Sequence, residues 1–301
     1  MNIARYTKQF LVAMVLIFIV AIGVVSTYGL NLGIDFTGGS LTEVSYTVAP
    51  EQAMLEEELD SLFEEGYSLR QSEDGETVGY ILRSRDLSEE ERETVYGVLT
   101  SVGEGGVVTR FASIGPVIGE ELKDKASWAI AGVVLITICY VAFAFRKVPK
   151  PVGSWTYGGI TILALIHDVL VPTAVMSVLG ITFGAEVDVL FVTALLAVLG
   201  YSVNDTIVVF DRVRENLLLN EEKKTGKTFE TVVEDSVKDT IVRSVNTSLT
   251  TILALGALYF LGGDTTQLFA LTLIVGVLAG TYSSLFIANP LLVAASRRKK
   301  A

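Results

Sequence analysis

Hydrophobic residues along the chain gather into six runs, each long enough to cross a membrane as a helix. The expected spans cover residues 10–28, 127–145, 155–179, 187–210, 241–261 and 268–295. The last run is long enough to tilt, or to break near Asn289-Pro290, because a proline disfavours a continuous helix. One long polar stretch, residues 31–125, separates the first two runs. The pattern therefore predicts six transmembrane helices and one domain outside the membrane.

The polar stretch alternates between strand and helix patterns. An acidic helical segment follows Pro50, and a second one follows Ser88, which forms a predicted capping box with Glu91. A turn signal, Glu-Asp-Gly, lies at residues 73–75. The expected strands cover residues 40–49, 67–71, 78–83 and 107–112. Their order, β-α-β-β-α-β, predicts a small α+β ferredoxin-like domain.

Lys and Arg residues in the short connections predict how the chain is oriented, because cytoplasmic loops are enriched in them. The connections at residues 180–186 and 262–267 contain no Lys or Arg. The basic residues near the other span ends are Arg5, Lys8, Arg146, Lys147, Lys150, Arg212, Arg214, Lys223, Lys224, Lys227, Arg297, Arg298, Lys299 and Lys300. Both termini are therefore expected in the cytoplasm and residues 30–125 outside.

This orientation divides the chain into four parts. The expected parts are a cytoplasmic N-terminus with the first span (1–29), the outer domain (30–125), five further spans (126–295) and a basic cytoplasmic tail (296–301). Half of the residues are hydrophobic and the mean hydropathy is +0.52. Residues 31–125 carry 21 acidic and 7 basic residues, a net charge of −14. Such a surface is usually only a solvated one, and it argues against nucleic-acid binding, which needs a basic patch.

Asp205 is the most informative residue, because it lies within a hydrophobic span. It is six residues before Asp211, where the charged end of this span begins, so it lies roughly 9 Å deep at 1.5 Å per residue. A charged side chain at the centre of a span costs about 2.5–3.5 kcal/mol on insertion scales. Chains retain such residues to pair with another group, to line a wet path or to carry protons.

The fourth and fifth spans carry polar residues that can accompany Asp205. At helical spacing Asn204 and Asp205 share a face with Tyr201, and Arg243 begins a threonine-containing stripe on the fifth span. Arg243 and Asp205 are expected at similar depth, where a cation favours the carboxylate and burial favours its protonated form. Such a pair can load and release protons, or it can be a static salt bridge that fixes packing. The polar stripe favours the first alternative.

The third span contains His167 and Asp168 near its midpoint. Adjacent helical residues point about 100° apart, so we do not expect both side chains to face lipid. They form either a second station for protons or a hydrogen-bonded contact between helices, and the sequence does not separate these alternatives. A single histidine does not indicate a metal site, and no metal or cofactor is expected.

No set of catalytic residues is visible, and we expect that the chain is not an enzyme. The outer domain has no His or Cys, and Cys139 is the sole cysteine of the chain, so no internal disulfide is possible. KKTGKT at 223–228 ends like a phosphate-binding loop, but Glu221 replaces the required first glycine. With ATP hydrolysis improbable, an ion gradient is the natural energy source.

The order of these features resembles the SecF proteins of the SecD/SecF family, in the RND superfamily of proton-driven transporters. The similar motifs are DFTGGS at 35–40, GYSVNDTIVVFDRVREN at 200–216, RSVNTSLTT at 243–251 and LIHDV at 165–169. The resemblance covers essentially the whole chain. Its signature residues are Asp35, Gly38, Gly39, Gly200, Asp211 and Arg212.

The resemblance implies an accessory subunit of the Sec protein-export machinery in the bacterial plasma membrane, with six spans as half of an RND-type bundle. The implied partners are SecD on another chain, the SecYEG channel, the translocating preprotein and membrane lipids. Asp205 would take part in proton passage with Arg243 as its functional partner, although sodium as the coupling ion is not excluded. The glycines after Asp35 and Thr37 permit a tight turn, and for Asp35 this turn and substrate contact are equally good interpretations.

Two other functions fit the same residues. One is an RND-type half-transporter for a small molecule or lipid, for which the outer domain is small. The other is a non-transporting assembly subunit of the translocon, in which Asp205 only holds a partner. An assembly role should tolerate Asp205→Asn, which keeps size and hydrogen bonding but cannot carry a proton.

Overall fold

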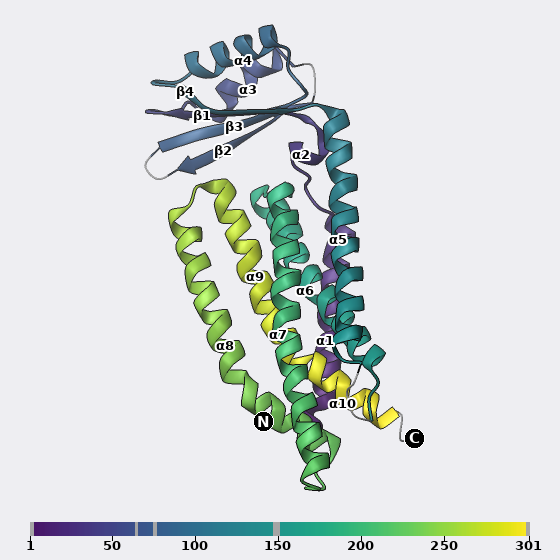
Figure 1. The fold of residues 1–301 in the computed structure, drawn as a ribbon. Coiled ribbons are helices and arrows are strands. Elements are labelled where there is room, and N and C mark those ends of the chain that lie inside the picture. The colour runs from purple at the N-terminus through teal and green to yellow at the C-terminus, as the bar shows by residue number, and fades with distance from the viewer. Residues whose placement is uncertain (1–2, 64–65, 75–76, 147–150, 299–301) are drawn as a thin grey trace. The chain divides into compact units, whose positions relative to one another are not determined.

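The computed structural model describes residues 3–63, 66–74, 77–146 and 151–298. The chain divides into two units, one formed by Met1–Asn31 with Trp128–Ala301 and the other by Leu32–Ser127. The first unit is helical, and the second contains a sheet with its covering helices (Figure 1). The turn signal expected at residues 73–75 lies partly outside the described residues.

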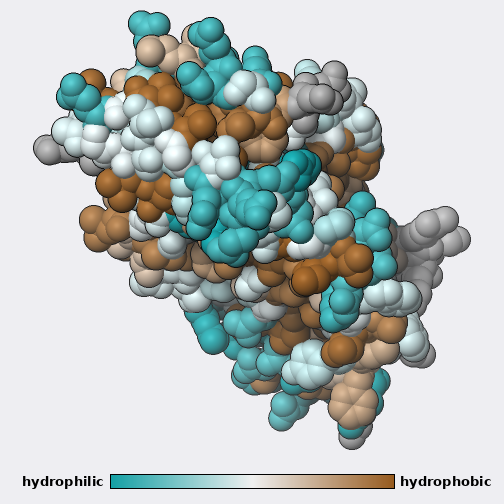
Figure 2. Space-filling model, turned by 90° about the horizontal axis from the view of Figure 1, so that it is seen from above, coloured by the Kyte–Doolittle hydropathy of each residue, from teal (hydrophilic) through white to brown (hydrophobic). Residues whose placement is uncertain are grey.

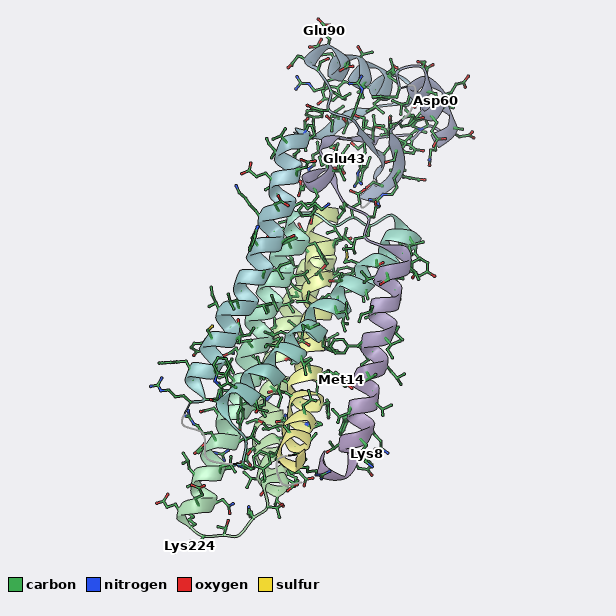
Figure 3. All side chains as sticks on the ribbon, turned by 90° about the vertical axis from the view of Figure 1, so that its right-hand side faces the viewer. Lys8, Met14, Glu43, Asp60, Glu90 and Lys224 are labelled. Atoms are coloured by element: carbon green, nitrogen blue, oxygen red, sulfur yellow. The ribbon has the colours of Figure 1, made fainter. Side chains whose placement is uncertain are left out.

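Six helical segments of the described chain are long and apolar enough to cross a membrane. Five are single helices, and the sixth is formed by two. They are α1 (Ile3–Tyr28), α5 (Pro116–Ala144), α6 (Ser154–Phe183), α7 (Val189–Glu222), α8 (Phe229–Leu261), and α9 (Asp264–Phe286) with α10 (Ala288–Arg298). Lys8 near the start of α1 and Lys224 between α7 and α8 lie at the same end of the helical unit (Figure 3). The six predicted spans are confirmed.

The last span breaks at Ile287, which ends α9 with φ −111° and ψ −56°. Pro290 falls in the first turn of α10, where a missing N–H removes no helical hydrogen bond. The Asn289 side chain donates to the Ser284 carbonyl at 2.7 Å and to the Leu285 carbonyl at 3.3 Å. It therefore satisfies acceptors that the end of α9 leaves open. Of the two expected possibilities, the structure contains the break.

Helix α9 contacts α6, α7 and α8 within the helical unit. Gly276 and Gly280 allow it to approach α7 closely. A Cβ added at Gly276 would lie 2.2 Å from Val198 Cγ2, and one at Gly280 would lie 3.0 Å from Ser202 Cβ. Small residues four apart permit such close packing of membrane helices. This approach brings the following turn of α9 next to polar residues of α6 and α7.

An aromatic cluster joins α5 to α6 and α7. Phe145 stacks on Tyr157 with ring centroids 5.2 Å apart and an angle of 6° between the rings. Phe210 lies edge-on to Tyr157 at 5.0 Å and to Phe145 at 5.9 Å. All three side chains are almost fully buried, and such pairs contribute about 0.5–1.5 kcal/mol each beyond the area they bury. The cluster therefore fixes one end of α5 against its neighbours.

The second unit has the predicted ferredoxin-like order β-α-β-β-α-β after a short helix, α2 (Ile34–Thr37). Its sheet is antiparallel with strand order β2-β3-β1-β4, and two helices cover one face (Figure 1). The strands are β1 (Gly39–Tyr46), β2 (Ser68–Asp74), β3 (Thr77–Ser84) and β4 (Val107–Ile114). The covering helices are α3 (Gln52–Asp60) and α4 (Glu89–Ser101). The predicted fold class is confirmed.

The core of this unit lies between the sheet and the two helices. Alternate residues of β1 and β3 point into it and meet apolar residues of α3 and α4. Its buried members are Val44, Tyr46, Leu55, Leu59, Phe63, Tyr80, Leu82, Val95 and Leu99. The Tyr46 hydroxyl donates to the Leu99 carbonyl at 2.5 Å, and burial raises the pKa of Tyr46 to about 12. The neutral phenol therefore ties β1 to α4 throughout the physiological range.

The predicted capping box at Ser88 is confirmed. The Glu91 N–H donates to Ser88 Oγ at 3.4 Å, and the Ser88 N–H donates to Glu91 Oε2 at 2.9 Å. Arg85 also pairs with Glu91, and these donors lower the pKa of Glu91 to about 2.

Seen from above, hydrophilic and hydrophobic residues are interspersed over the exposed surface (Figure 2).

The Gly38-Gly39 pair makes the turn between α2 and β1. Both residues have positive φ, 73° and 114°. A Cβ at Gly39 would lie 2.5 Å from the Ser84 carbonyl oxygen, and one at Gly38 would lie 2.8 Å from Pro116 Cα. Any side chain would therefore meet backbone atoms that cannot move easily. The tight turn expected of these glycines is present, whereas Asp35 lies in α2 and its contact with a substrate stays a prediction.

We expect Gly39→Ala to destabilise the sheet unit by about 1–3 kcal/mol, because the new methyl adds strain at a positive φ and a clash with Ser84. Hydrogen exchange of the β1 and β3 amides in the full-length protein measures this loss. Gly97→Ala is the matched control, because a Cβ there meets nothing within 4 Å and alanine favours the helix. Equal protection in both variants would contradict the proposed constraint.

Candidate functional site

Asp168 is completely buried in the helical unit, on α6. Its Oδ2 accepts hydrogen bonds from Ser202 of α7 and from Ser283 of α9, the latter at 2.8 Å. Its Oδ1 lies 2.9 Å from Nδ1 of His167. Pro172, one turn later in α6, has no N–H to donate to the Asp168 carbonyl. The carboxyl group is thus held by side chains from three helices.

His167 is also buried, with only 2 % of its surface exposed. Its ring lies 5.9 Å from the ring of Phe18 on α1 and 5.9 Å from that of Tyr282 on α9. Its Nε2 atom has no hydrogen-bond partner within the described structure. One imidazole nitrogen therefore engages Asp168, while the other faces an aromatic environment. This geometry is compatible with both interpretations of the pair from the sequence, a proton station and a contact between helices.

Asp205 is half-buried on α7, on the side that faces α8 and α9. Ser244 of α8 donates to its Oδ1 at 2.5 Å, and Ser284 of α9 donates to its Oδ2. Hydroxyl donors stabilise an ionised carboxylate without adding a charge. Among the described residues, neither Asp205 nor Asp168 forms an ion pair with a Lys or Arg. Serines therefore contact both carboxyl groups, and His167 is a further contact of Asp168.

A second set of hydroxyls continues from this site. Tyr201 donates to Ser248 Oγ at 3.3 Å, and Ser248 Oγ lies 2.5 Å from Thr281 Oγ1. Hydroxyl groups both donate and accept, so a connected row of them can pass a proton by successive exchange. Together, α6, α7, α8 and α9 supply a polar interior with two carboxyl groups. No group of three or more His, Cys, Asp or Glu side chains able to hold a metal occurs among the described residues.

The structure separates the other predicted relay residues from this interior. Asn204 and Arg243 are exposed on the surface of the helical unit. The Arg243 guanidinium contacts no carboxylate in the described part of the chain, so an ion pair with Asp205 is not formed within this chain. Ser244, its neighbour on α8, takes the place beside Asp205. A role of Asn204 and Arg243 in proton passage stays a prediction.

Sequence reasoning missed the serine donors. Ser202, Ser244, Ser283 and Ser284 are buried, and each contacts one of the two carboxyl groups. Serine is common in membrane helices as a packing residue, so a single serine carries little signal. The adjacent pair Ser283-Ser284 was the stronger clue, because its two side chains cannot point to the same neighbour.

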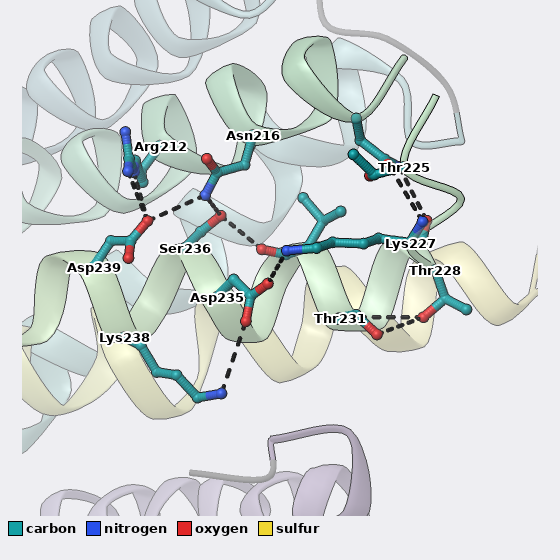
Figure 4. Close-up of polar contacts among 12 residues, drawn as sticks. Arg212, Asn216, Thr225, Lys227, Thr228, Thr231, Asp235, Ser236, Lys238 and Asp239 are labelled. Carbon is teal, nitrogen blue, oxygen red and sulfur yellow. Dashed lines mark hydrogen bonds and ion pairs between the residues drawn. The ribbon is translucent and has the colours of Figure 1, made fainter. Parts of the chain in front are cut away.

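The signature residues Asp211 and Arg212 lie one and two residues past the hydrophobic part of α7. Arg212 contacts Asp239 of α8 through Nε at 2.9 Å and Nη2 at 2.7 Å (Figure 4). It also pairs with Glu215 of its own helix at 2.8 Å. Asp211 pairs with Arg214 of its own helix at 2.6 Å. Arg212 therefore joins α7 to α8.

The signature residue Gly200 has no close neighbour that would require a glycine, because a Cβ there would meet nothing within 4 Å.

The KKTGKT segment forms the connection between α7 and α8. Asn220 holds it, because Asn220 Nδ2 donates to the Lys227 carbonyl at 3.0 Å and Oδ1 accepts from the Lys227 N–H at 3.1 Å (Figure 4). Thr228 then accepts from the Thr231 N–H and begins α8 as its N-cap. A recess of about 370 Å³ beside it has both lysines and aspartates in its lining. The segment is a helix connection, and the resemblance to a phosphate-binding loop is superficial.

Comparison with known proteins identifies relatives of this arrangement. A family model described as protein export membrane protein SecD/SecF, C-terminal, matches residues 95–298, and one for the SecD/SecF GG motif matches residues 23–49. The protein translocase subunit SecF of Thermobaculum terrenum is 40 % identical, across 97 % of this chain and 93 % of the relative. The protein translocase subunit SecDF of Thermus thermophilus is 36 % identical across 100 % of this chain and 39 % of its own length.

A solved structure has the same fold. The crystal structure of SecDF from Thermus thermophilus, described as a translocon-associated membrane protein, superposes with a TM-score of 0.84 at 34 % identity. The similarity covers 99 % of this chain and 39 % of that chain. The relative therefore contains a large additional region to which this chain has no counterpart in the match.

We expect Asp239→Ala to loosen the connection between α7 and α8, because it removes both hydrogen bonds from Arg212 across the helix pair. The side chains are partly exposed, so the expected loss of local stability is about 1 kcal/mol or less. Hydrogen exchange of residues 216–232 measures it. Asp211→Ala removes a pair within one helix and should leave these amides unchanged; equal effects would refute the assignment.

Proposed function

This chain belongs to the SecD/SecF family of protein export membrane proteins, and from that membership we propose how it works. It is an accessory subunit of the Sec protein-export machinery that acts with SecD to use the proton-motive force. The energy drives preprotein translocation across the plasma membrane. The outer domain, residues 30–125, contacts the emerging preprotein, and the SecYEG channel is the machine that the subunit assists.

One observation carries this proposal: two carboxyl groups, Asp168 and Asp205, lie inside apolar spans, where serine hydroxyls donate to both and, among the described residues, no Lys or Arg pairs with either, although His167 also contacts Asp168. A carboxyl group that is not paired with a fixed counter-ion can gain and lose a proton. Each such change alters its charge and therefore its interactions with the surrounding groups. One charge that crosses 100 mV carries about 2.3 kcal/mol. That energy is enough to shift an equilibrium between two conformations by roughly fiftyfold. Protons are the proposed coupling ion.

The charge distribution supports the orientation. Lys8 and Lys224 lie at one end of the helical unit (Figure 3), and the connection after α6 contains Glu186 and Asp188 but no Lys or Arg. The protein is a multi-pass membrane protein. We place its basic end, and therefore both termini, in the cytoplasm, because cytoplasmic loops are enriched in Lys and Arg. The sheet unit then lies outside.

SecD is the proposed occupant of the exposed polar face of α7 and α8. The exposed polar residues are Asn204 on α7 and Arg243, Asn246, Thr247 and Thr250 on α8. An arginine with no counter-ion is costly at membrane depth, so a protein partner is a better neighbour than lipid. The relative named SecDF is one polypeptide of which this chain matches 39 %. Its remaining length supports a SecD half supplied here by another chain.

We expect Asp205→Asn to abolish preprotein export while SecD still co-purifies. The amide keeps the size of the side chain, and its oxygen can accept from one serine while its NH2 donates to the other, but it cannot take up a proton. Export is measured in cells whose sole copy carries the variant. Glu222→Gln is the matched control and should leave export normal, because Glu222 is exposed at the end of α7, outside the signature motif and the polar interior.

Normal export in the Asp205→Asn cells would refute proton coupling through this residue and leave a packing or assembly role. Loss of SecD co-purification would contradict the expectation that the amide leaves the complex intact. Unchanged protein export accompanied by loss of small-molecule resistance would favour the half-transporter.

A cysteine at position 246 should cross-link to SecD. The single native cysteine, Cys139, is removed first by Cys139→Ser, and Asn246→Cys then places one thiol on the polar face of α8. Leu135→Cys is the control on α5, where an exposed apolar residue indicates contact with lipid. The expected SecD adduct forms from position 246 alone. An adduct from position 135 and none from 246 would place SecD elsewhere.

A further inference from the structure

The two carboxyl groups of the site are bound by adjacent residues of a single helix. Ser283 of α9 donates to Asp168 Oδ2, and Ser284, the next residue, donates to Asp205 Oδ2. Adjacent side chains of a helix point about 100° apart, so the pair can reach two neighbouring helices at once. Ser202, three residues before Asp205 on α7, donates to Asp168 as well. The carboxyl groups thus share both α9 and one turn of α7.

Each of the two α9 serines has a second acceptor on its own helix. Ser283 Oγ lies 3.1 Å from the Gly280 carbonyl, and Ser284 Oγ lies 3.1 Å from the Thr281 carbonyl. A serine hydroxyl has one hydrogen, so it donates one full hydrogen bond at a time. The hydroxyl can therefore turn between a carboxylate and a backbone carbonyl. The orientation toward the carboxyl group suits an ionised carboxylate, and the orientation toward the backbone carbonyl suits a protonated, neutral carboxyl group.

We propose that Ser283 and Ser284 are positioning residues that couple Asp168 to Asp205, so that a change of protonation at one carboxyl group alters the hydrogen bonding of the other. The proposal rests on the proposed proton-coupling function and deepens it. An ionised Asp205 holds the Ser284 hydroxyl, and a protonated Asp205 releases it to the Thr281 carbonyl. Because Ser283 is the preceding residue of the same helix, this change alters the hydrogen bond that Ser283 donates to Asp168.

The packing around α9 favours transmission. Gly276 and Gly280 hold it against α7, so the turn that carries the serines has little freedom to move independently. Asn289 donates to the Ser284 carbonyl at 2.7 Å, and its own Oδ1 is buried without a partner among the described residues. The break at Ile287 follows directly. The turn of α9 that carries the two serines is therefore preceded by glycines packed against α7 and followed by the helix break at Ile287.

Few other ionisable groups face the pair. On α6 His167 contacts Asp168, and on α9 Tyr282 lies beside the His167 ring. On α7 Tyr201 contacts Ser248 rather than either carboxyl group. On α8 Arg243 neighbours Ser244 in sequence but is exposed. The serines are therefore the direct contacts through which one carboxyl group senses the other.

Infrared difference spectroscopy on the full chain purified with SecD tests this coupling. The band lost in Asp168→Asn is assigned to the Asp168 carboxyl group, and its position is then compared with and without Asp205→Asn. We expect Asp205→Asn to shift this band. In a Ser283→Ala, Ser284→Ala background the shift should disappear, and in the corresponding threonine double variant, which restores both hydroxyls, it should return.

Ser296→Ala is the matched control, because Ser296 is equally buried but donates only to the Val293 carbonyl of its own helix in the described contacts. It should keep the full shift. A shift that persists in the alanine double variant, or no shift in the native background, would overturn the coupling. If the coupling fails while Asp205→Asn still abolishes export, the proposed function survives. If the band shifts as expected but Asp205→Asn exports normally, the function fails and the coupling stands.

Discussion

The helical unit depends on satisfying two carboxyl groups inside apolar helices. Hydrocarbon offers no donors, so the carboxyl oxygens need donors from the protein, and three of the four find one on a neighbouring helix that must come close enough to provide it. Small residues meet both needs. Gly276 and Gly280 bring α9 against α7, and the serines one turn later reach the carboxyl groups from there. The arrangement of the central helices thus follows from the requirement to bury Asp168 and Asp205.

Hydroxyl donors differ from cations in what they allow. A buried ion pair keeps its carboxylate ionised, because protonation would leave the cation uncompensated. A serine loses little when its acceptor is protonated, since it can accept a hydrogen bond or turn to its own helix. The serine contacts therefore do not require a fixed charge at either carboxyl group. The proposed proton coupling rests on this property, which a static salt bridge would not provide.

The sequence predicted the elements well because their signals are local. Hydrophobic runs defined the six spans, alternation and the capping box of Ser88 defined the ferredoxin-like domain, and the glycine pair defined a turn. Asp205 and Asp168 were identified for the same reason, since a charge within an apolar run stands out. Their partners were not, because a hydrogen bond between helices depends on rotation and depth, which residue spacing along one helix does not determine. Arg243 was the obvious cation for Asp205, yet the adjacent Ser244 is the residue that faces it.

One helix, α7, divides its polar residues among different neighbours. Asp205 faces α8 and α9, Ser202 faces α6, Arg212 joins α8 beyond the apolar part, and Asn204 points outward. This chain satisfies the first three. Asn204 and Arg243 remain at the surface of the unit, next to exposed apolar residues such as Val242 and Leu249. A polar strip within an apolar surface is unfavourable in lipid and favourable against a partner that offers acceptors. The same physical requirement that organises the interior therefore supports the proposed protein partner at this polar strip.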